Sequence, residues 1–154
     1  MLPAPHAHLI VPRLWLGDKE ASMDAEFLKR EGITSVFNCT KDLPFSPTIK
    51  RQFRVPVDDN LAAEELANMR RWAPEIVAKV LNEHNHGHTV LVHCFAGKQR
   101  SAAVVAMTLV AKTRQTADAA MAYIRQRRPV AFFPAANFDP SIRGFETAFN
   151  KYRS

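Results

Sequence analysis

The sequence predicts an α/β domain with a central, mostly parallel sheet of about four or five strands flanked by helices. Short runs rich in β-branched and aromatic residues alternate along the chain with segments in which apolar residues recur three and four positions apart. This alternation favours a parallel sheet, because parallel strands need a crossover connection that is usually helical. The 154 residues are 47% hydrophobic and 23% charged, and we interpret residues 1–154 as a single domain.

Composition excludes several classes of protein. Two cysteines are too few for a scaffold held together by disulfides. No run of about eighteen apolar residues occurs, and residues 1–10 lack the positively charged start of a secretory signal. We therefore expect a cytoplasmic protein with no stable membrane insertion. Lys and Arg outnumber Asp and Glu by 21 to 15, a formal net charge of +6, which favours anionic partners.

The first part of the chain is predicted to form a strand, a helix and a second strand. Residues 8–17 mix β-branched and aromatic residues and are expected to form one strand. Residues 22–30 have helical spacing, with Ser22 as the expected N-cap and Gly32 ending the helix. Residues 33–38 are expected to form a short buried strand.

Two strands and four helices are predicted in the rest of the chain. Pro74 is expected to kink or split the predicted helix of residues 64–84. Asp139 with Pro140 is the predicted start of the helix of residues 139–152. The predicted strands are residues 53–57 and 89–93, and the predicted helices are residues 64–84, 101–112, 117–125 and 139–152.

The segment HCFAGKQRS, at residues 93–101, lies between a predicted buried strand and an apolar helix. Ligands in α/β proteins bind beyond the carboxyl ends of strands. A loop that enters a helix there directs several backbone N–H groups at one point, which creates an anion site. Gly97 permits the bend, and Arg100 supplies a planar fork for two phosphate oxygens. The expected phosphate-binding residues are Phe95, Ala96, Gly97, Lys98, Gln99 and Arg100.

Cys94 stands at the start of this loop, where the N–H groups and Arg100 favour the thiolate. A thiolate that faces a bound phosphate is a nucleophile for phosphorus. His93 is expected to hydrogen-bond the loop backbone, and Ser101 to donate to the sulfur when it leaves. Taken alone, Cys94 fits a buried core cysteine and Arg100 a surface charge. Their joint spacing favours the catalytic interpretation.

The pattern of His-Cys, five residues and Arg-Ser resembles the signature of the cysteine-dependent protein tyrosine phosphatases, and the short chain points to their dual-specificity branch. The resemblance implies that family's fold, with the phosphate loop at its centre. It also implies hydrolysis of phosphotyrosine and phosphoserine/threonine in phosphorylated proteins through a phosphocysteine, with no metal and no other cofactor. Other stretches similar to that branch are residues 11–17, 33–38, 55–60 and 128–138.

Such a mechanism needs an acid to protonate the leaving oxygen. Asp58 and Asp59 follow a predicted strand and are the candidates. The resemblance favours Asp59 as the acid and Asp58 as a flanking residue, and the alternative is that both are turn residues. The resemblance also implies a supporting position for Asn38, at the end of its strand.

Other substrates and another class of function remain as alternatives. Lys98 resembles a loop lysine of phosphatases that act on phosphoinositides, although Phe95 stands where those relatives often carry a second base. The basic excess would also suit an RNA 5′-phosphate. A non-catalytic phosphate-binding module is the third alternative, but a module that only binds has no need of the thiol.

Cys39 follows the strand of residues 33–38. In some relatives a cysteine at a similar place forms a reversible disulfide with the catalytic thiol, and the resemblance suggests this pairing for Cys39 and Cys94. The alternative is a small buried hydrophobic residue. The three histidines between residues 84 and 88 lie in a predicted turn, and we expect no metal there. The arginines at residues 125–128 are interpreted as a solvated helix end, with contact to acidic substrates as the alternative.

Overall fold

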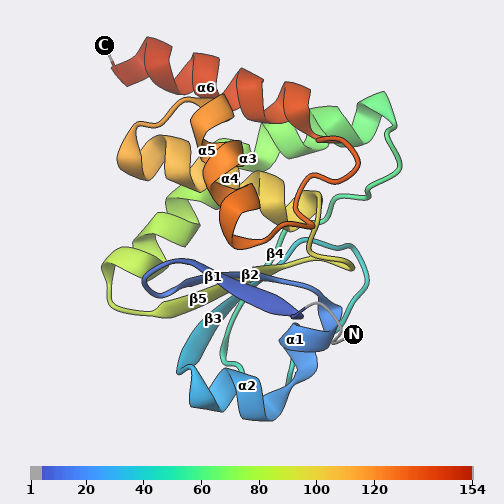
Figure 1. Cartoon of the computed structure of the whole chain (residues 1–154), viewed down its shortest axis with the longest axis vertical. Helices are drawn as coiled ribbons and strands as arrows, with labels where there is room; N and C mark the ends of the chain where they lie inside the picture. The colour runs from blue at the N-terminus through green and yellow to red at the C-terminus, as the bar shows by residue number, and fades with distance from the viewer. Residues whose placement is uncertain (1–4, 154) are drawn as a thin grey trace.

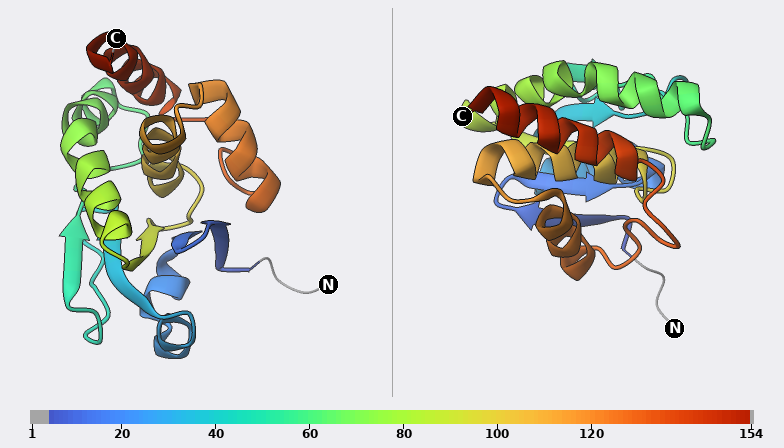
Figure 2. Two further views of the ribbon diagram at one scale, coloured as in Figure 1. Left: turned by 90° about the vertical axis from the view of Figure 1, so that its left-hand side faces the viewer. Right: turned by 90° about the horizontal axis from the view of Figure 1, so that it is seen from above.

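The computed structural model describes residues 5–153. Five strands form one sheet, in the order β1-β2-β5-β3-β4. The strands are β1 (Ala7–Val11), β2 (Leu14–Gly17), β3 (Ile33–Asn38), β4 (Arg51–Arg54) and β5 (Thr89–His93). The helices are α1 (Lys19–Met23), α2 (Ala25–Arg30), α3 (Ala63–Asn85), α4 (Arg100–Thr113), α5 (Ala117–Arg127) and α6 (Asp139–Arg153). Helices α1 and α2 cover one face of the sheet and α3 to α6 cover the other (Figures 1 and 2).

The sheet is parallel except for β1, which pairs antiparallel with β2. The predicted α/β class with a mostly parallel sheet is therefore confirmed. The central strand is β5, and its apolar run is fully buried, as expected for a strand covered on both faces. At its carboxyl end His93 lies opposite Gly17 of β2 and Asn38 of β3. Three parallel strands thus end at one edge, directly before the loop that carries Cys94.

The single strand predicted at residues 8–17 is wrong, because the segment forms the hairpin of β1 and β2. The turn lies at Pro12 and Arg13, and Arg13 has a φ of 65°. A residue with positive φ reverses the chain in a tight turn. The apolar pattern on either side of the turn did not reveal this reversal.

The single helix predicted at residues 22–30 is also wrong. Two short helices stand there, capped by Asp18 and Asp24, whose carboxylates accept from the N–H groups three residues further on over 3.0 and 3.1 Å. Ser22 is not a cap, because it is buried inside α1. Gly32 follows the second helix with a φ of 68°, which confirms the predicted end.

The remaining elements lie close to their predicted positions, with two differences. Strand β4 begins and ends earlier than residues 53–57, at Arg51 and Arg54. Helix α3 continues through Pro74 without a split. Helix α4 is buried along most of its length and packs against β5, with α3, α5 and α6 around it, so that α4 forms the centre of the larger helical layer.

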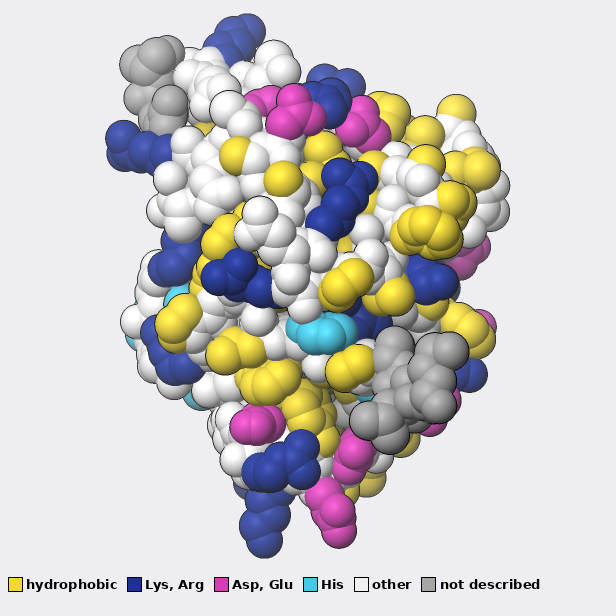
Figure 3. Space-filling view, in the orientation of Figure 1, with side chains coloured by type: hydrophobic (Ala, Val, Ile, Leu, Met, Phe, Trp, Pro, Cys, Tyr) yellow, Lys and Arg dark blue, Asp and Glu magenta, His cyan; other side chains and the backbone are white. Residues whose placement is uncertain are grey.

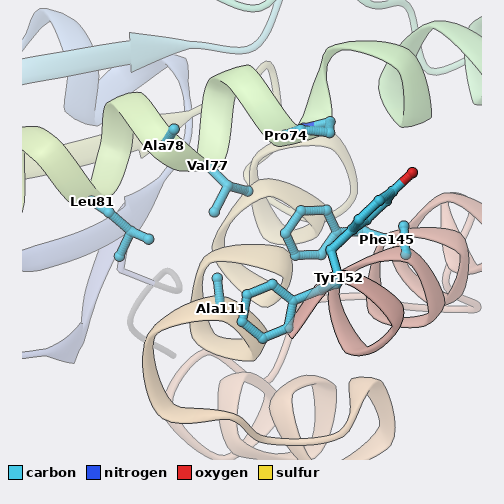
Figure 4. A pocket seen from close by; sticks show the side chains of 9 residues that line it. Pro74, Val77, Ala78, Leu81, Ala111, Phe145 and Tyr152 are labelled. Carbon is cyan, nitrogen blue, oxygen red and sulfur yellow. The ribbon is translucent and has the colours of Figure 1, made fainter. Parts of the chain in front are cut away.

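An apolar groove lies between α3 and α6 at the carboxyl-terminal end of α4. Its volume is about 370 Å³. In Figure 4, Val77 and Leu81 from α3 and Ala111 from α4 point toward the aromatic side chains of α6, among them Phe145. The groove lies at the opposite end of α4 from the Cys94 loop.

The basic excess of the sequence does not gather on the face seen in Figure 3. Lys and Arg side chains of the described residues are scattered there among hydrophobic and uncoloured surface. Among residues 5–153, no helix is both long enough and apolar enough to cross a membrane.

An ion pair between the buried Glu83 of α3 and the exposed Arg51 of β4 joins α3 to the edge of the sheet. Glu83 is 2% exposed, and both of its oxygens are bound by the guanidinium of Arg51, with Arg51 Nη2 2.7 Å from Oε2. Ser35 of β3 donates to Oε1 over 2.6 Å. Arg51, and then the Ser35 hydroxyl, lower the pKa of Glu83 to about 2 against the opposing effect of burial.

We predict that Glu83→Gln lowers the free energy of unfolding at pH 7 by about 2–3 kcal/mol, because a charged hydrogen-bonded pair is broken at a buried position. The pKa of the folded state lies below the ordinary value of 4.5, so this stabilisation is present above that value and is lost as the pH falls toward 2. Urea unfolding at pH 7 and pH 3 measures both effects. The control is Glu75→Gln, which breaks an exposed pair on the same helix and should cost below about 0.5 kcal/mol. Equal losses in the two variants would contradict the prediction.

Candidate active site

The loop of residues 94–99 joins the end of β5 to the start of α4 and borders a cavity of about 330 Å³. Segments that are distant in the sequence meet around this cavity. The residues that line it are Asp59, Cys94, Phe95, Ala96, Lys98, Gln99, Arg100, Phe133, Pro134 and Asn137.

The backbone carbonyl groups of this loop accept hydrogen bonds from residues outside the loop. Each carbonyl oxygen of residues 95–99 accepts a hydrogen bond from another part of the chain. The N–H groups of Lys19, Phe132 and Ala103 donate to residues 95, 98 and 99, over 3.1, 2.7 and 2.8 Å. By contrast, the N–H groups of residues 95–99 donate to no other residue in the described part of the chain. The loop therefore has a set of donors available to an anion in the cavity.

Arg128 binds the two remaining carbonyls. Its Nε donates to the carbonyl of Gly97 over 2.8 Å and its Nη2 to that of Ala96 over 3.2 Å. Its Nη1 lies 3.1 Å from the carbonyl oxygen of Pro5 and 2.9 Å from His8 Nδ1. The side chain is 2% exposed, so the predicted solvated helix end is wrong for Arg128. Sequence reasoning missed this function, because the carbonyls that Arg128 binds lie about thirty residues away.

Gly97 is a position where the loop lies directly against β2. Its φ is 67°, a region that side-chained residues rarely adopt. A Cβ atom there would lie 2.5 Å from the carbonyl oxygen of Gly17 and 2.8 Å from Arg128 Nη2. The bend that the sequence assigns to Gly97 thus needs glycine both for its φ and for space.

Cys94 is a free thiol, and its Sγ lies 3.1 Å from the hydroxyl of Ser101 in the first turn of α4. His93 is buried, and its Nδ1 lies 3.3 Å from the carbonyl oxygen of Cys94. Burial lowers the pKa of His93 to about 4, so the ring is neutral at pH 7. A neutral ring that donates from Nδ1 anchors the carbonyl at the start of the loop.

Arg100 connects the loop to the segment of the two candidate acids. Its Nη1 donates to the carbonyl of Val57 over 3.0 Å. Its Nε is buried and has no acceptor among the described residues. A buried donor without an acceptor is costly, and an oxyanion in the cavity would provide one.

The two adjacent candidate acids differ in their contacts. Asp59 lines the cavity, and its Oδ1 accepts from Asn137 Nδ2 over 2.9 Å. Asp58 does not line the cavity, and its Oδ2 lies 3.2 Å from Lys41 Nζ. The geometry therefore favours Asp59 as the group that can reach a bound substrate.

Gln99 holds the far wall of the cavity. Its amide nitrogen donates to the carbonyls of Phe133 and Ala135 over 3.3 and 2.7 Å, and its Oε1 accepts from the N–H of Asn137 over 2.9 Å. This side chain is thus committed to the segment before α6, and only its backbone N–H remains for an anion. Sequence analysis did not assign a role to Asn137. The residue belongs to a stretch that resembles the family, but nothing in the sequence indicates its contact with Asp59.

The other predicted residues surround the loop. Lys98 lines the cavity. Phe95 lines it too but is 53% exposed, with Lys19 Nζ 4.1 Å from the centre of its ring. Asn38 is buried and donates to the carbonyl of Leu43 over 2.8 Å, so it supports the chain after β3 rather than the cavity. Cys39 is a free, buried thiol, and burial and the nearby Cys94 both raise its pKa.

We predict that Arg128→Ala weakens binding of tungstate, a phosphate-like oxyanion, by about 10-fold or more. The variant frees the carbonyls of residues 96 and 97, so the loop no longer holds its amides in one arrangement. Calorimetric titration measures the affinity. The control is Arg127→Ala, which changes the exposed last residue of α5 next to Arg128 and should bind tungstate as the unchanged protein does. Unchanged affinity in the Arg128 variant would contradict the role assigned to this guanidinium.

Comparisons with known proteins agree with this geometry. The sequence profile of the dual specificity phosphatase catalytic domain matches residues 14–148. Dual specificity protein phosphatase 2 from Homo sapiens is 33% identical over 139 residues, which are 90% of this chain and 43% of the relative. Dual specificity phosphatase 28 from Mus musculus is 31% identical over 152 residues, which are 97% of this chain and 85% of the relative.

Solved structures show the same fold. A mouse putative dual specificity phosphatase complexed with zinc tungstate has a TM-score of 0.85 at 27% identity, covering 99% of this chain and 94% of its own. Human DUSP28 has a TM-score of 0.84 at 28% identity and covers 97% of each chain. Because the family profile spans most of the sequence and the loop around Cys94 has the arrangement described above, the chain belongs to the dual specificity phosphatase catalytic-domain family.

Proposed function

We propose that this chain hydrolyses phosphotyrosine and phosphoserine/threonine in phosphorylated proteins through a phosphocysteine on Cys94. The observation that carries the proposal is a free thiol beside a loop whose carbonyls are bound from outside, which leaves its amides for an anion. Family membership supports the same chemistry. The chain spans less than half the length of several relatives it matches, including dual specificity protein phosphatases 2 and 8 from Homo sapiens, so the proposal concerns the catalytic unit.

The first step transfers the phosphoryl group to the protein. The Cys94 thiolate attacks phosphorus, the S–P bond forms, and the bond between phosphorus and the leaving oxygen breaks. The Asp59 carboxyl gives its proton to that oxygen. Arg100 and the loop amides bind the other phosphate oxygens, where negative charge is concentrated in the transition state.

The second step returns the thiolate. Asp59, now a carboxylate, takes a proton from water as the water attacks phosphorus. The S–P bond breaks, inorganic phosphate leaves, and Asp59 is protonated for the next turnover. The Ser101 hydroxyl, 3.1 Å from Sγ, donates to the sulfur as its charge returns. The cycle balances with water as its co-reactant.

Phosphoinositides and RNA 5′-phosphates would use the same chemistry, and Lys98 at the cavity is the residue that favours such anionic substrates. The scattered basic surface of Figure 3 gives no further support to a nucleic acid. A reducing compartment such as the cytoplasm suits a mechanism that depends on a free thiol.

We predict that Cys94→Ser lowers turnover of phosphotyrosine and phosphothreonine peptides by about 1,000-fold or more while the peptides still bind, because the hydroxyl is a far weaker nucleophile. Phosphate release measures turnover, and calorimetry measures capture. A phosphoinositide and an RNA with a 5′-triphosphate serve as comparison substrates. Hydrolysis by the variant at the rate of the unchanged protein would show that Cys94 is not the nucleophile. A protein that binds phosphopeptide but hydrolyses none of the panel would be a binding module.

Two substrates whose leaving groups differ in their need for a proton can show whether Asp58 or Asp59 is the acid. We predict that Asp59→Asn lowers kcat/KM about 100-fold for phenyl phosphate, whose leaving oxygen needs a proton, and far less for p-nitrophenyl phosphate. Asp58→Asn is the matched control, with a change below about 3-fold on both substrates. If the Asp58 variant instead has the larger leaving-group effect, the acid is Asp58.

We also propose that peroxide joins Cys39 to Cys94. The Cys94 thiolate takes oxygen from peroxide to form a sulfenic acid, and the Cys39 thiol then attacks that sulfur, forming the disulfide and releasing water. Two contacts support the pairing: both cysteines belong to the same buried core cluster, and the N–H of Cys39 donates over 2.8 Å to the carbonyl of His93, which directly precedes Cys94. Peptide mapping after brief peroxide treatment should reveal the crosslink. A Cys94 that is oxidised with no crosslinked peptide would refute the pairing.

A further inference from the structure

We infer that the ion pair of Lys41 and Glu65 positions the general acid, by holding the backbone of residues 58–59, the acid segment, in place relative to the strand that precedes Cys94. This inference rests on the proposed function. Neither residue lines the cavity, so both act through Asp59 rather than on the substrate.

Glu65 is the centre of the arrangement. It lies in the first turn of α3, is 5% exposed, and its Oε2 accepts from the backbone N–H of Asp58 over 3.1 Å. Lys41 Nζ lies 2.7 Å from the same oxygen, and Asn68 donates to Oε1 over 2.8 Å. Lys41, and then Asn68 and the Asp58 amide, lower the pKa of Glu65 to about 2 although burial opposes them. Glu65 therefore stays ionised and provides a fixed acceptor for the acid segment.

Lys41 connects this acceptor to the nucleophile. It lies in the chain that leaves β3, two residues after Cys39, whose N–H donates to the carbonyl of His93 over 2.8 Å. His93 directly precedes Cys94. Lys41 also contacts the Asp58 carboxylate at 3.2 Å. The acid segment is thus bound through Lys41 to a stretch that is anchored on β5.

The acid segment is held at two adjacent residues by two different partners. Glu65 binds the backbone of Asp58, and Asn137 binds the side chain of Asp59. Asn137 is in turn bound by Gln99 of the phosphate loop. Loss of the Glu65 charge would weaken the contact with the Asp58 backbone, so that Asp59 would spend less time within reach of the leaving oxygen. Positioning of this kind affects only the step that needs the proton.

The test compares two substrates that differ in their need for a proton. We expect Glu65→Gln to lower kcat/KM for phenyl phosphate about 10-fold and for p-nitrophenyl phosphate less than about 2-fold. Lys41→Met should give the same selectivity with a smaller effect. In an Asp59→Asn background, Glu65→Gln should cause no further selective loss, since the proton donor is already gone. The matched control is Glu64→Gln, which changes an exposed carboxylate in the same turn of α3 and should leave both substrates unaffected.

Each outcome decides the inference. An equal loss on both substrates, or no loss, in Glu65→Gln would overturn it, as would an undiminished selective loss in the Asp59→Asn background. Should Glu65→Gln fail to fold, as seen by circular dichroism, the selectivity of Lys41→Met decides in its place. Inactivity of the unchanged protein on both substrates would overturn the proposed function, and this inference with it. Normal turnover by the unchanged protein without selectivity in the variants would overturn the inference alone.

Discussion

The active site depends on one constraint, which is that the carbonyl oxygens of residues 95–99 are bound from outside the loop. A peptide group has a donor at one end and an acceptor at the other, so binding the acceptors elsewhere leaves the donors for an anion. The partners come from α1, the start of α4, the segment after α5 and the buried guanidinium of Arg128. Four separate parts of the chain therefore contribute to a loop of six residues, and the proposed affinity for phosphate would depend on all of them.

The same framework brings the proposed general acid to the loop that carries Cys94. Arg100 reaches the carbonyl of Val57 just before the acid segment, and Asn137 reaches Asp59 from the segment before α6. The proposed nucleophile, Cys94, and the proposed acid, Asp59, are 35 positions apart in the chain, so their relative position depends on these tertiary contacts. A catalytic pair needs such ties, because errors of about 1 Å in placement can cost about 100-fold in rate.

The sequence was informative where the signal is local and uninformative where it is not. The candidate phosphate-binding loop could be located because Cys94, Gly97 and Arg100 lie within seven residues and each residue type has a chemical reason to be there. The fold class could be predicted because the alternation of patterns extends over the whole chain. The hairpin at Arg13 was missed, since positive φ at a side-chained residue leaves no apolar pattern. Asp24, which ends α1 and caps α2, divided what looked like one helix.

The roles of buried charged residues were the hardest to predict from the sequence. Arg128 looked like part of a basic helix end, and Glu65 like one more polar residue at the start of a helix. Their partners lie in other segments, and only the folded chain shows that burial has been offset by hydrogen bonds. A single sequence contains no record of such pairings.

The close approach of Gly97 to Gly17 has a consequence for the way in which the protein acquires its activity. The two glycines are 80 positions apart in the chain and come together at the distance that a single Cβ would occupy. Contacts of such long sequence separation form late, because the intervening polypeptide must be ordered first. The proposed anion site should accordingly form only when the whole domain has folded, and a partly folded chain would expose the Cys94 thiol before that site exists.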